Sequence, residues 1–184
     1  MIFGYQIDKD IKLKILEERE AGQLFKLVDS NRKYLAEFLP FVEHTKRVED
    51  SKHFIHSALK QFIDGNGFHC GIWSDKELIG VIGLHYLDLV NKRTSIGYYL
   101  AEDFQKKGIM TRCTKALIQY VYEEYDINRI EIRMSTKNKK SRAIPIRLGF
   151  TQEGILRSDE CLQGEFSDSY VYSVLREEYE NEYK

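Results

Sequence analysis

The sequence predicts an α+β fold with a central, mostly antiparallel mixed sheet of about seven strands, flanked by helices. Two observations predict it. Between Phe68 and Leu100 the chain alternates strand-like runs with short polar turns. From Ile109 the apolar period becomes helical and a new strand pattern begins at Arg129, which indicates one strand–helix–strand unit in the second half.

The first third of the chain is expected to form a strand at 11–15 and then two helices. Apolar residues on one face define the first helix: Ala21, Leu24, Phe25 and Val28. Pro40 should stop any helix that reaches it, because a proline restricts the residue before it. Asp50 or Ser51 can cap the second helix, and the glycines of Gly65-Asn66-Gly67 should end it.

The remaining strands and helices follow from the same patterns. An antiparallel meander is predicted from strands at 68–73, 78–87 and 94–100. After the helix that begins at Ile109, we expect a strand at 129–134, a small helix ending at Leu148-Gly149-Phe150, and strands at 151–156 and 169–175.

Length and composition favour a single soluble domain over residues 1–184. With 28 basic and 29 acidic residues the net charge is −1, which removes the general electrostatic argument for direct nucleic-acid binding. No apolar run is long enough to span a membrane, and the N-terminus lacks a signal-peptide pattern. Three cysteines without metal-ligand spacing predict reduced thiols, no metal site and a cytoplasmic location.

The loop before the helix at Ile109 carries the most chemistry. A helix N-terminus offers unpaired amides and the positive end of the helix dipole, and a glycine such as Gly108 lets the backbone curl around an anion. Lys106, Lys107 and Arg112 add positive charge. These features predict a polyphosphate site, although a lysine pair can also be a solvated corner. Neither the GxxxxGK[ST] nor the GxGxxG pattern is present.

Four segments in order resemble one enzyme family. Gln105-Lys106-Lys107-Gly108-Ile109-Met110 is similar to the acetyl-CoA motif (Q/R)-x-x-G-x-(G/A) of the GNAT N-acetyltransferases, with Met110 in place of the small sixth residue. The other three resemble the RimJ/RimL-type branch of that family: Leu39-Pro40-Phe41, then Asn138-Lys139-Lys140-Ser141 followed by Arg147-Leu148-Gly149-Phe150, and finally the stretch from Leu156 to Asp168.

The resemblance implies a GNAT-like fold whose sheet splays in the middle, with acetyl-CoA as cosubstrate lying in the gap. The residues that it implies for cofactor binding are Tyr99, Leu100 and Ala101 through their main chain, Gln105, Lys106, Lys107, Gly108, Ile109 and Met110 around the diphosphate, and Asn138 and Ser141 near the pantetheine and the sulfur. The Met110 side chain would crowd the diphosphate or widen the loop. Tyr98 and Tyr170 can reach the same gap, but packing is the simpler role for each.

The implied reaction is attack of a neutral amine on the thioester. Ser141 is the candidate for returning a proton to the departing thiolate, although it can equally be an N-cap. Glu160 is the candidate for accepting the amine proton or attracting a cationic substrate, although it can also be a solvated loop acid. The five histidines have no partner spacing, and no role is assigned to them.

The pKa values of amines narrow the choice of acceptor amine. An α-amine titrates near 7.7–8.0 and a lysine near 10.4, so an α-amine needs little help from a base at neutral pH. The first hypothesis is therefore acetylation of a protein N-terminus, as in the RimJ/RimL-type resemblance, whose members act on ribosomal proteins. A small amine such as a polyamine, an amino acid or an antibiotic is the alternative, and a non-catalytic acyl-CoA-binding module or a cofactor-free interaction protein are others. Tyrosines and apolar strands in the last third can cover a homo-oligomer surface.

Overall fold

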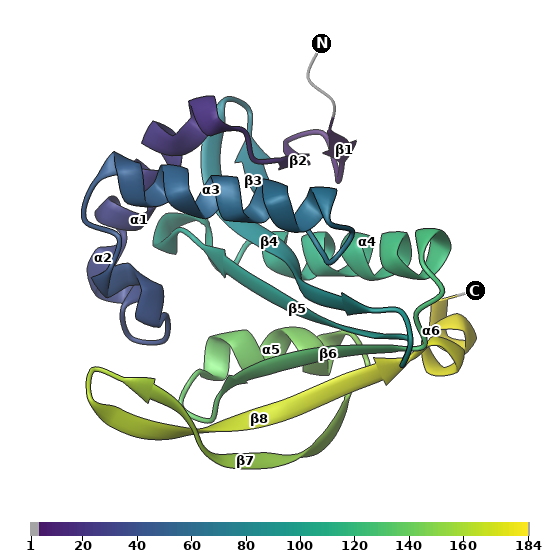
Figure 1. The fold of residues 1–184 in the computed structure, drawn as a ribbon. Coiled ribbons are helices and arrows are strands. Elements are labelled where there is room, and N and C mark those ends of the chain that lie inside the picture. The colour runs from purple at the N-terminus through teal and green to yellow at the C-terminus, as the bar shows by residue number, and fades with distance from the viewer. Residues whose placement is uncertain (1–3, 184) are drawn as a thin grey trace.

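The computed structural model describes residues 4–183, and within them eight strands form one sheet (Figure 1). The strand order is β1-β2-β3-β4-β5-β6-β8-β7, and only β5 and β6 are parallel neighbours. The strands are β1 Tyr5–Gln6, β2 Ile11–Ile15, β3 His69–Ser74, β4 Glu77–Asp88, β5 Arg93–Leu100, β6 Arg129–Ser135, β7 Thr151–Leu162 and β8 Glu165–Leu175. The predicted fold class is confirmed, with one more strand than expected.

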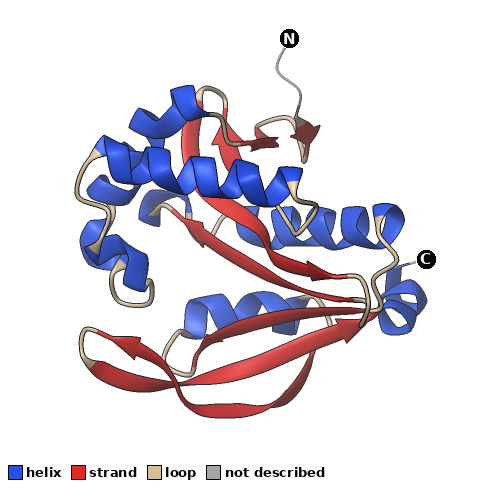
Figure 2. Ribbon diagram, viewed as in Figure 1, coloured by secondary structure: helices blue, strands red, loops and turns tan. Residues whose placement is uncertain are grey.

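Helices cover both faces of this sheet (Figure 2). They are α1 Ala21–Ser30, α2 Arg32–Leu35, α3 Val48–Ile63, α4 Ile109–Glu124, α5 Lys139–Arg147 and α6 Arg176–Tyr183. In the views of Figures 1 and 2, α1, α2 and α3 lie in front of the sheet, and α4 and α5 lie behind it. We call these two sides the front face and the back face.

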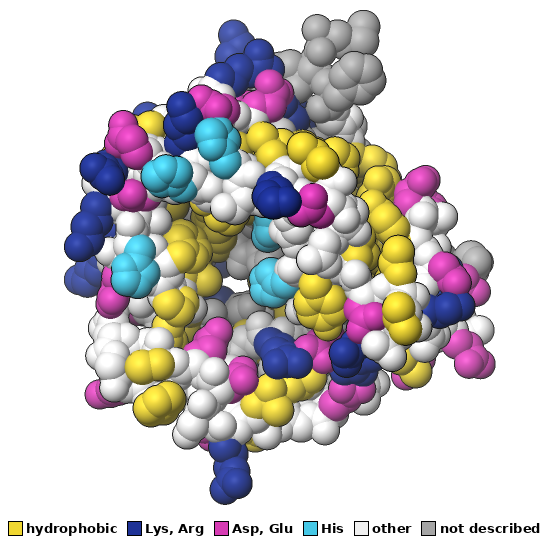
Figure 3. All heavy atoms as spheres, in the orientation of Figure 1, with side chains coloured by type: hydrophobic (Ala, Val, Ile, Leu, Met, Phe, Trp, Pro, Cys, Tyr) yellow, Lys and Arg dark blue, Asp and Glu magenta, His cyan; other side chains and the backbone are white. Residues whose placement is uncertain are grey.

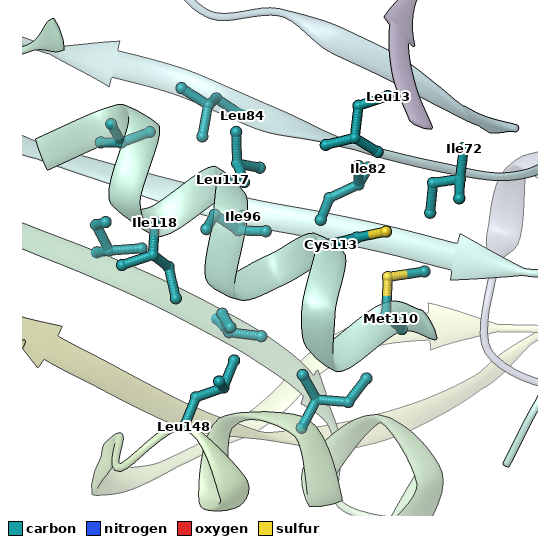
Figure 4. Close-up of a cluster of buried hydrophobic side chains, with 14 of the residues drawn as sticks. Leu13, Ile72, Ile82, Leu84, Ile96, Met110, Cys113, Leu117, Ile118 and Leu148 are labelled. Carbon is teal, nitrogen blue, oxygen red and sulfur yellow. The ribbon is translucent and has the colours of Figure 1, made fainter. Parts of the chain in front are cut away.

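The back face is closed by an apolar core under α4. Its buried side chains at Met110, Cys113, Leu117 and Ile118 pack against β4 and β5 (Figure 4). The apolar period predicted from Ile109 therefore matches the helix. Met110 is only 7% exposed and contributes to this core, so its bulk is accommodated among apolar neighbours rather than in the loop before the helix.

The sheet opens between β5 and β6. Their parallel pairing consists of Arg93 with Arg129, Thr94 with Ile130, and Ser95 with Glu131, although β5 continues to Leu100 and β6 to Ser135. Beyond Ser95 the two strands diverge, as Figure 1 shows. The splayed sheet implied by the sequence resemblance is present, and the gap begins immediately after Ser95.

Several element boundaries differ from the prediction. Helix α3 begins at Val48, and Asp50 lies in its first turn, where the carboxylate accepts hydrogen bonds from the amides of Lys46 and Arg47. Such an acid accepts hydrogen bonds from amides that precede the helix, as in a capping box. It therefore lies inside the first turn and not at the start of the helix. Strands β7 and β8 are also longer than predicted, because β7 is exposed at most positions and the buried residues in the outer half of β8 are serines, Ser167 and Ser169, which give no apolar alternation.

Candidate active site

One cleft of about 580 Å³ collects most of the residues that the sequence singled out. It lies where the end of β5, the loop before α4 and the start of α5 meet. The predicted site residues that line it are Tyr99, Leu100, Gln105, Lys106, Gly108, Ile109, Met110, Asn138 and Ser141. Ala101, Lys107 and Glu160 do not line it.

The loop before α4 presents a run of backbone amides without acceptors. Lys106 and Gly108 both have left-handed φ angles, 60° and 69°, which curl the chain just before the helix. The first helical hydrogen bond here runs from the amide of Arg112 to the carbonyl of Gly108. Among residues 4–183, no hydrogen-bond acceptor is found for the amides from 106 to 111. Six consecutive free donors at a helix N-terminus are suited to an anion with several oxygens.

The charges around this loop are arranged differently from the expectation. Arg112 does not stand free, because its Nε donates to the Asp8 carboxylate at 2.9 Å and its Nη1 to the Lys107 carbonyl at 2.9 Å. It therefore braces the loop. The Lys107 ammonium lies over the Phe104 ring, 4.8 Å from its centroid, while Lys106 lines the cleft. Lys140, which the sequence did not single out for the cofactor, also lines the cleft.

Main-chain groups of β5 face the gap at alternate residues. The amide of Ala101 donates to Ile79 on β4 at 2.8 Å, so it points away from β6. In a strand, successive residues direct their amide and carbonyl to opposite edges. The main-chain groups of Tyr98 and Leu100 therefore face the gap, where β6 no longer pairs with β5. Of the three residues expected to offer main-chain contacts, Leu100 is the one whose main-chain groups face the gap.

Ser141 is not the N-cap of α5. The helix begins at Lys139, and the side-chain oxygen of Asn138 accepts a hydrogen bond of 3.0 Å from the Ser141 amide. Asn138 is therefore the cap, which leaves the Ser141 hydroxyl for other contacts. That hydroxyl donates to the Tyr98 hydroxyl at 3.3 Å, and the Tyr98 hydroxyl donates to the Ser141 carbonyl at 3.2 Å. Burial raises the pKa of Tyr98, so the phenol remains protonated at neutral pH.

Glu160 belongs to the opposite side of the sheet opening. It lies on β7 opposite Ser167 of β8, whose hydroxyl donates to the Ser135 hydroxyl at the end of β6. Burial, followed by the charge of Asp159, raises the pKa of Glu160. Near the tip of the same hairpin, Gln163 donates to the carbonyl of Ala36 just after α2. The hairpin thus reaches across to the α2 region.

The front face of the molecule is hollowed between these parts. Figure 3 shows a depression with apolar, acidic and histidine side chains at its edge, on the side of the sheet opposite α4 and α5. Tyr99 of β5 faces this front side, where its ring lies 5.3 Å from that of Phe41. Tyr98, the residue before it, contacts α5 on the back. The cleft is lined by Tyr34 and Tyr99 on this front side and by Ser141 on the back, so it spans both faces beside the end of β5.

Tyr98, for which packing was the simpler expectation, makes a contact in the site that the sequence does not predict. The sequence shows it as one of twelve tyrosines, and nothing in its neighbourhood predicts a bond to a residue 43 positions away. Within residues 4–183, no helix is long and apolar enough to cross a membrane. The cysteines divide as expected for ordinary thiols: Cys113 is buried, Cys70 is partly buried and Cys161 is exposed.

The arrangement fits an acyl-CoA thioester. The free amides are suited to the diphosphate, the gap with unpaired main-chain groups is suited to the pantetheine arm, and hydroxyls stand at the far end. Fold and site together define an acyl-CoA-dependent acyltransferase.

Comparison with known proteins identifies the family. Residues 11–151 match the model of the acetyltransferase (GNAT) domain, and the chain belongs to this family. It is an acetyl-CoA-dependent N-acetyltransferase. It is 36% identical to the putative ribosomal N-acetyltransferase YdaF of Bacillus subtilis (strain 168) over 182 residues, which cover 98% of this chain and 100% of that one.

Two solved structures show similar folds with cofactor bound. One is RimL, described as the ribosomal L7/L12 alpha-N-protein acetyltransferase, in complex with coenzyme A, with 26% identity, a TM-score of 0.90, and 94% and 98% of the two chains covered. The other is the microcin C7 self immunity acetyltransferase MccE in complex with acetyl-CoA and AMP, with 30% identity, a TM-score of 0.88, and 92% and 94% covered.

Proposed function

We propose that this enzyme acetylates the N-terminal α-amine of a protein, with a ribosomal protein as the first candidate. The observation that carries the proposal is the two-sided site: one cleft spans both faces beside the end of β5, and the front face is hollowed. An open hollow admits the end of an extended chain. The names of similar proteins, YdaF and RimL, support this acceptor class. Such a substrate would place the enzyme in the cytoplasm.

In this proposal the back part of the cleft holds acetyl-CoA and its front side presents the amine. The amides from 106 to 111 bind the diphosphate, and main-chain groups of Tyr98 and Leu100 hold the pantetheine arm. A gap-facing amide also stabilises the thioester oxygen as negative charge develops on it. The Ser141 hydroxyl, linked to the protonated Tyr98 phenol, delivers the proton to the leaving sulfur. Glu160 attracts the cationic end of the acceptor from the hairpin side.

An acceptor screen tests this proposal. Purified enzyme is given acetyl-CoA with a peptide that has a free α-amine, the same peptide with a blocked N-terminus and an internal lysine, and a set of small amines. Thiol release and the mass of the product are measured. We expect turnover with the free α-amine and at least about a hundredfold less with the lysine peptide, because far less of its amine is neutral at pH 7. Turnover confined to small amines would overturn the proposal.

A small-molecule amine is the second candidate function. It is favoured by the similarity to MccE, a self-immunity acetyltransferase whose structure contains AMP together with acetyl-CoA. In the same screen, this candidate predicts turnover of a polyamine, an amino acid or an amine-bearing antibiotic and none of the peptide. Both candidates use the same cofactor cleft, so the screen separates them by the acceptor alone.

A further inference from the structure

A histidine on β4 stands in an irregular part of the sheet. Strand β4 pairs Leu84 with Ile96 and Tyr86 with Ser95, so His85 is an extra residue with no direct partner on β5. Such a bulge redirects a side chain from its regular position, and bulges recur beside active sites. Here the redirected side chain is an imidazole.

The neighbouring strand makes room for this ring. A Cβ placed on Gly97 of β5 would overlap the Nε2 of His85, so the Nε2 end of the ring occupies the space above the glycine. Gly83 of β4 makes room for His69 of β3 in the same way, because a Cβ on Gly83 would come within 2.5 Å of Nδ1 of His69. Two imidazoles thus lie over two glycines that face each other in the β4–β5 register. Any larger residue at Gly97 would push His85 away.

The position of Gly97 links this ring to the reaction. Ser95 is the last residue of β5 that pairs with β6, and Gly97 lies two residues beyond it, where the gap opens. Tyr98 and Leu100, whose main-chain groups face the cofactor gap, follow directly. Because Gly97 shares the front side with Tyr99, the His85 ring lies at the narrow end of the gap on the side from which an acceptor would enter.

We propose that His85 is a further catalytic residue, whose Nε2 accepts a proton from the ammonium group of the acceptor before the amine attacks. The neutral amine then forms the N–C bond as the C–S bond breaks. Its second proton leaves with the sulfur as the thiol by way of Ser141, and His85 passes the first proton to solvent. The inference rests on acetyl transfer at the gap and holds for either acceptor class.

The surroundings of His85 favour the neutral ring, which can accept a proton. The residue is accessible to solvent, and among residues 4–183 no hydrogen-bond partner is found for either ring nitrogen. Desolvation, followed by the positive charge of Arg133 on β6, lowers the pKa of His85. His69 on β3 is the other titratable neighbour, and burial lowers its pKa to about 4. Gln61 of α3, which bonds the His85 carbonyl, is uncharged. Both imidazoles are therefore neutral at pH 7.

His85→Gln tests the proposal, and His56→Gln is the matched control because His56 pairs with Glu18 away from the gap. Each variant is assayed with the amine that the unaltered enzyme turns over best, so the identity of the acceptor is not at issue. Calorimetry with acetyl-CoA accompanies each assay. We expect His85→Gln to lower kcat about tenfold to a hundredfold with acetyl-CoA affinity unchanged, the low end applying to an α-amine, which is roughly a tenth neutral at pH 7, and His56→Gln to have no effect. In the unaltered enzyme, kcat/KM should fall only at a pH below 6.5, the ordinary histidine pKa, because the pKa of His85 is lowered.

An amino-oxy version of the same acceptor separates proton removal from positioning. Its nucleophilic nitrogen carries no charge at neutral pH, so it has no proton to lose before attack. The loss in His85→Gln should shrink to less than about threefold with this acceptor. Gly97→Ala, which displaces the ring but keeps the imidazole, should give the same pattern if His85→Gln does not fold. Full activity of His85→Gln, or an equal loss with both acceptors, would overturn the proposal.

Discussion

The two sides of β5 are built in different ways. The proposed cofactor side is mostly backbone, with amides from one continuous stretch, 106–111, and main-chain groups of the adjacent strand. The proposed acceptor side is made of side chains from distant segments: His85 of β4, Tyr99 of β5 and Glu160 of β7. A backbone site depends on local conformation and tolerates varied side chains. A side-chain site depends on which residues the fold brings together, so it can change while the cofactor remains the same.

The largest effect should come from Gly108→Asp. A Cβ on Gly108 would lie 3.0 Å from Nη1 of Arg112, so the new carboxylate would compete for the arginine that braces the loop and would add a like charge near the proposed diphosphate site. Two like charges about 4 Å apart near a protein surface repel by about 4 kcal/mol, and because pairing with Arg112 offsets part of this repulsion, we expect CoA affinity to fall about a hundredfold. Calorimetry with CoA measures this loss. Gly108→Asn is the matched control, because asparagine tolerates a left-handed φ and has nearly the same shape without the charge. A folded Gly108→Asp variant with unchanged CoA affinity would show that the diphosphate binds elsewhere.

A smaller effect, confined to turnover, is expected for Ser141→Ala. The helix cap is Asn138, so losing the Ser141 hydroxyl leaves α5 intact while breaking the contact with Tyr98. We expect kcat to fall about tenfold to a hundredfold, at the low end for proton-transfer groups, because Tyr98 and water can partly substitute. Affinity for acetyl-CoA should change less than about threefold. Equal losses in kcat and in affinity would instead make Ser141 a binding residue.

The difference between the two sides also explains what the sequence could predict. The loop from Gln105 to Met110 is contiguous, and its function follows from a glycine, a helix start and unpaired amides, which a pattern can reveal. The core position of Met110 follows from the helical period that begins at Ile109. By contrast, the bond between Tyr98 and Ser141 joins residues 43 positions apart, and no local pattern marks it.

Placement of Glu160 and His85 depends on features with weak local signals. The β7–β8 hairpin is exposed along most of its length, so its extent does not follow from an apolar alternation. The bulge at His85 adds one residue to a strand without a glycine or proline to mark it. The alternative that Ser141 caps the helix is wrong by three residues, because Asn138 has an equally good capping side chain.

Asn138→Ala should have a moderate effect on stability rather than on chemistry. Removing a capping side chain costs about 1 kcal/mol, which corresponds to a fall of roughly 2–4 °C in Tm for a protein of this size. Asn138→Asp, which retains the capping oxygen, should recover the loss when Tm is measured by thermal unfolding without ligand. If both variants unfold at the temperature of the unaltered protein, the cap does not limit its stability. A drop in acetyl-CoA affinity in Asn138→Asp alone would point to a contact with the cofactor as well.

The smallest expected effect concerns Glu160, and it tests the role of this residue on the proposed acceptor side. Its pKa is raised in the folded protein, so the folded state holds its proton at pH values where the unfolded chain has already lost it. Stability therefore falls as the pH rises from the ordinary glutamate pKa through the raised one. Glu160→Gln removes this dependence, and its Tm relative to the unaltered enzyme should be higher at pH 7 than at pH 4.

Asp159→Asn supplies the matched control, because removing the neighbouring charge should lower the pKa of Glu160 and shift the same window to lower pH. Kinetics of Glu160→Gln then define its role on the acceptor side. A higher KM for a cationic acceptor with kcat nearly unchanged makes Glu160 a residue that attracts the substrate and leaves proton removal to His85. A fall in kcat of about a hundredfold, removed by the amino-oxy acceptor, would make Glu160 the proton acceptor in its place.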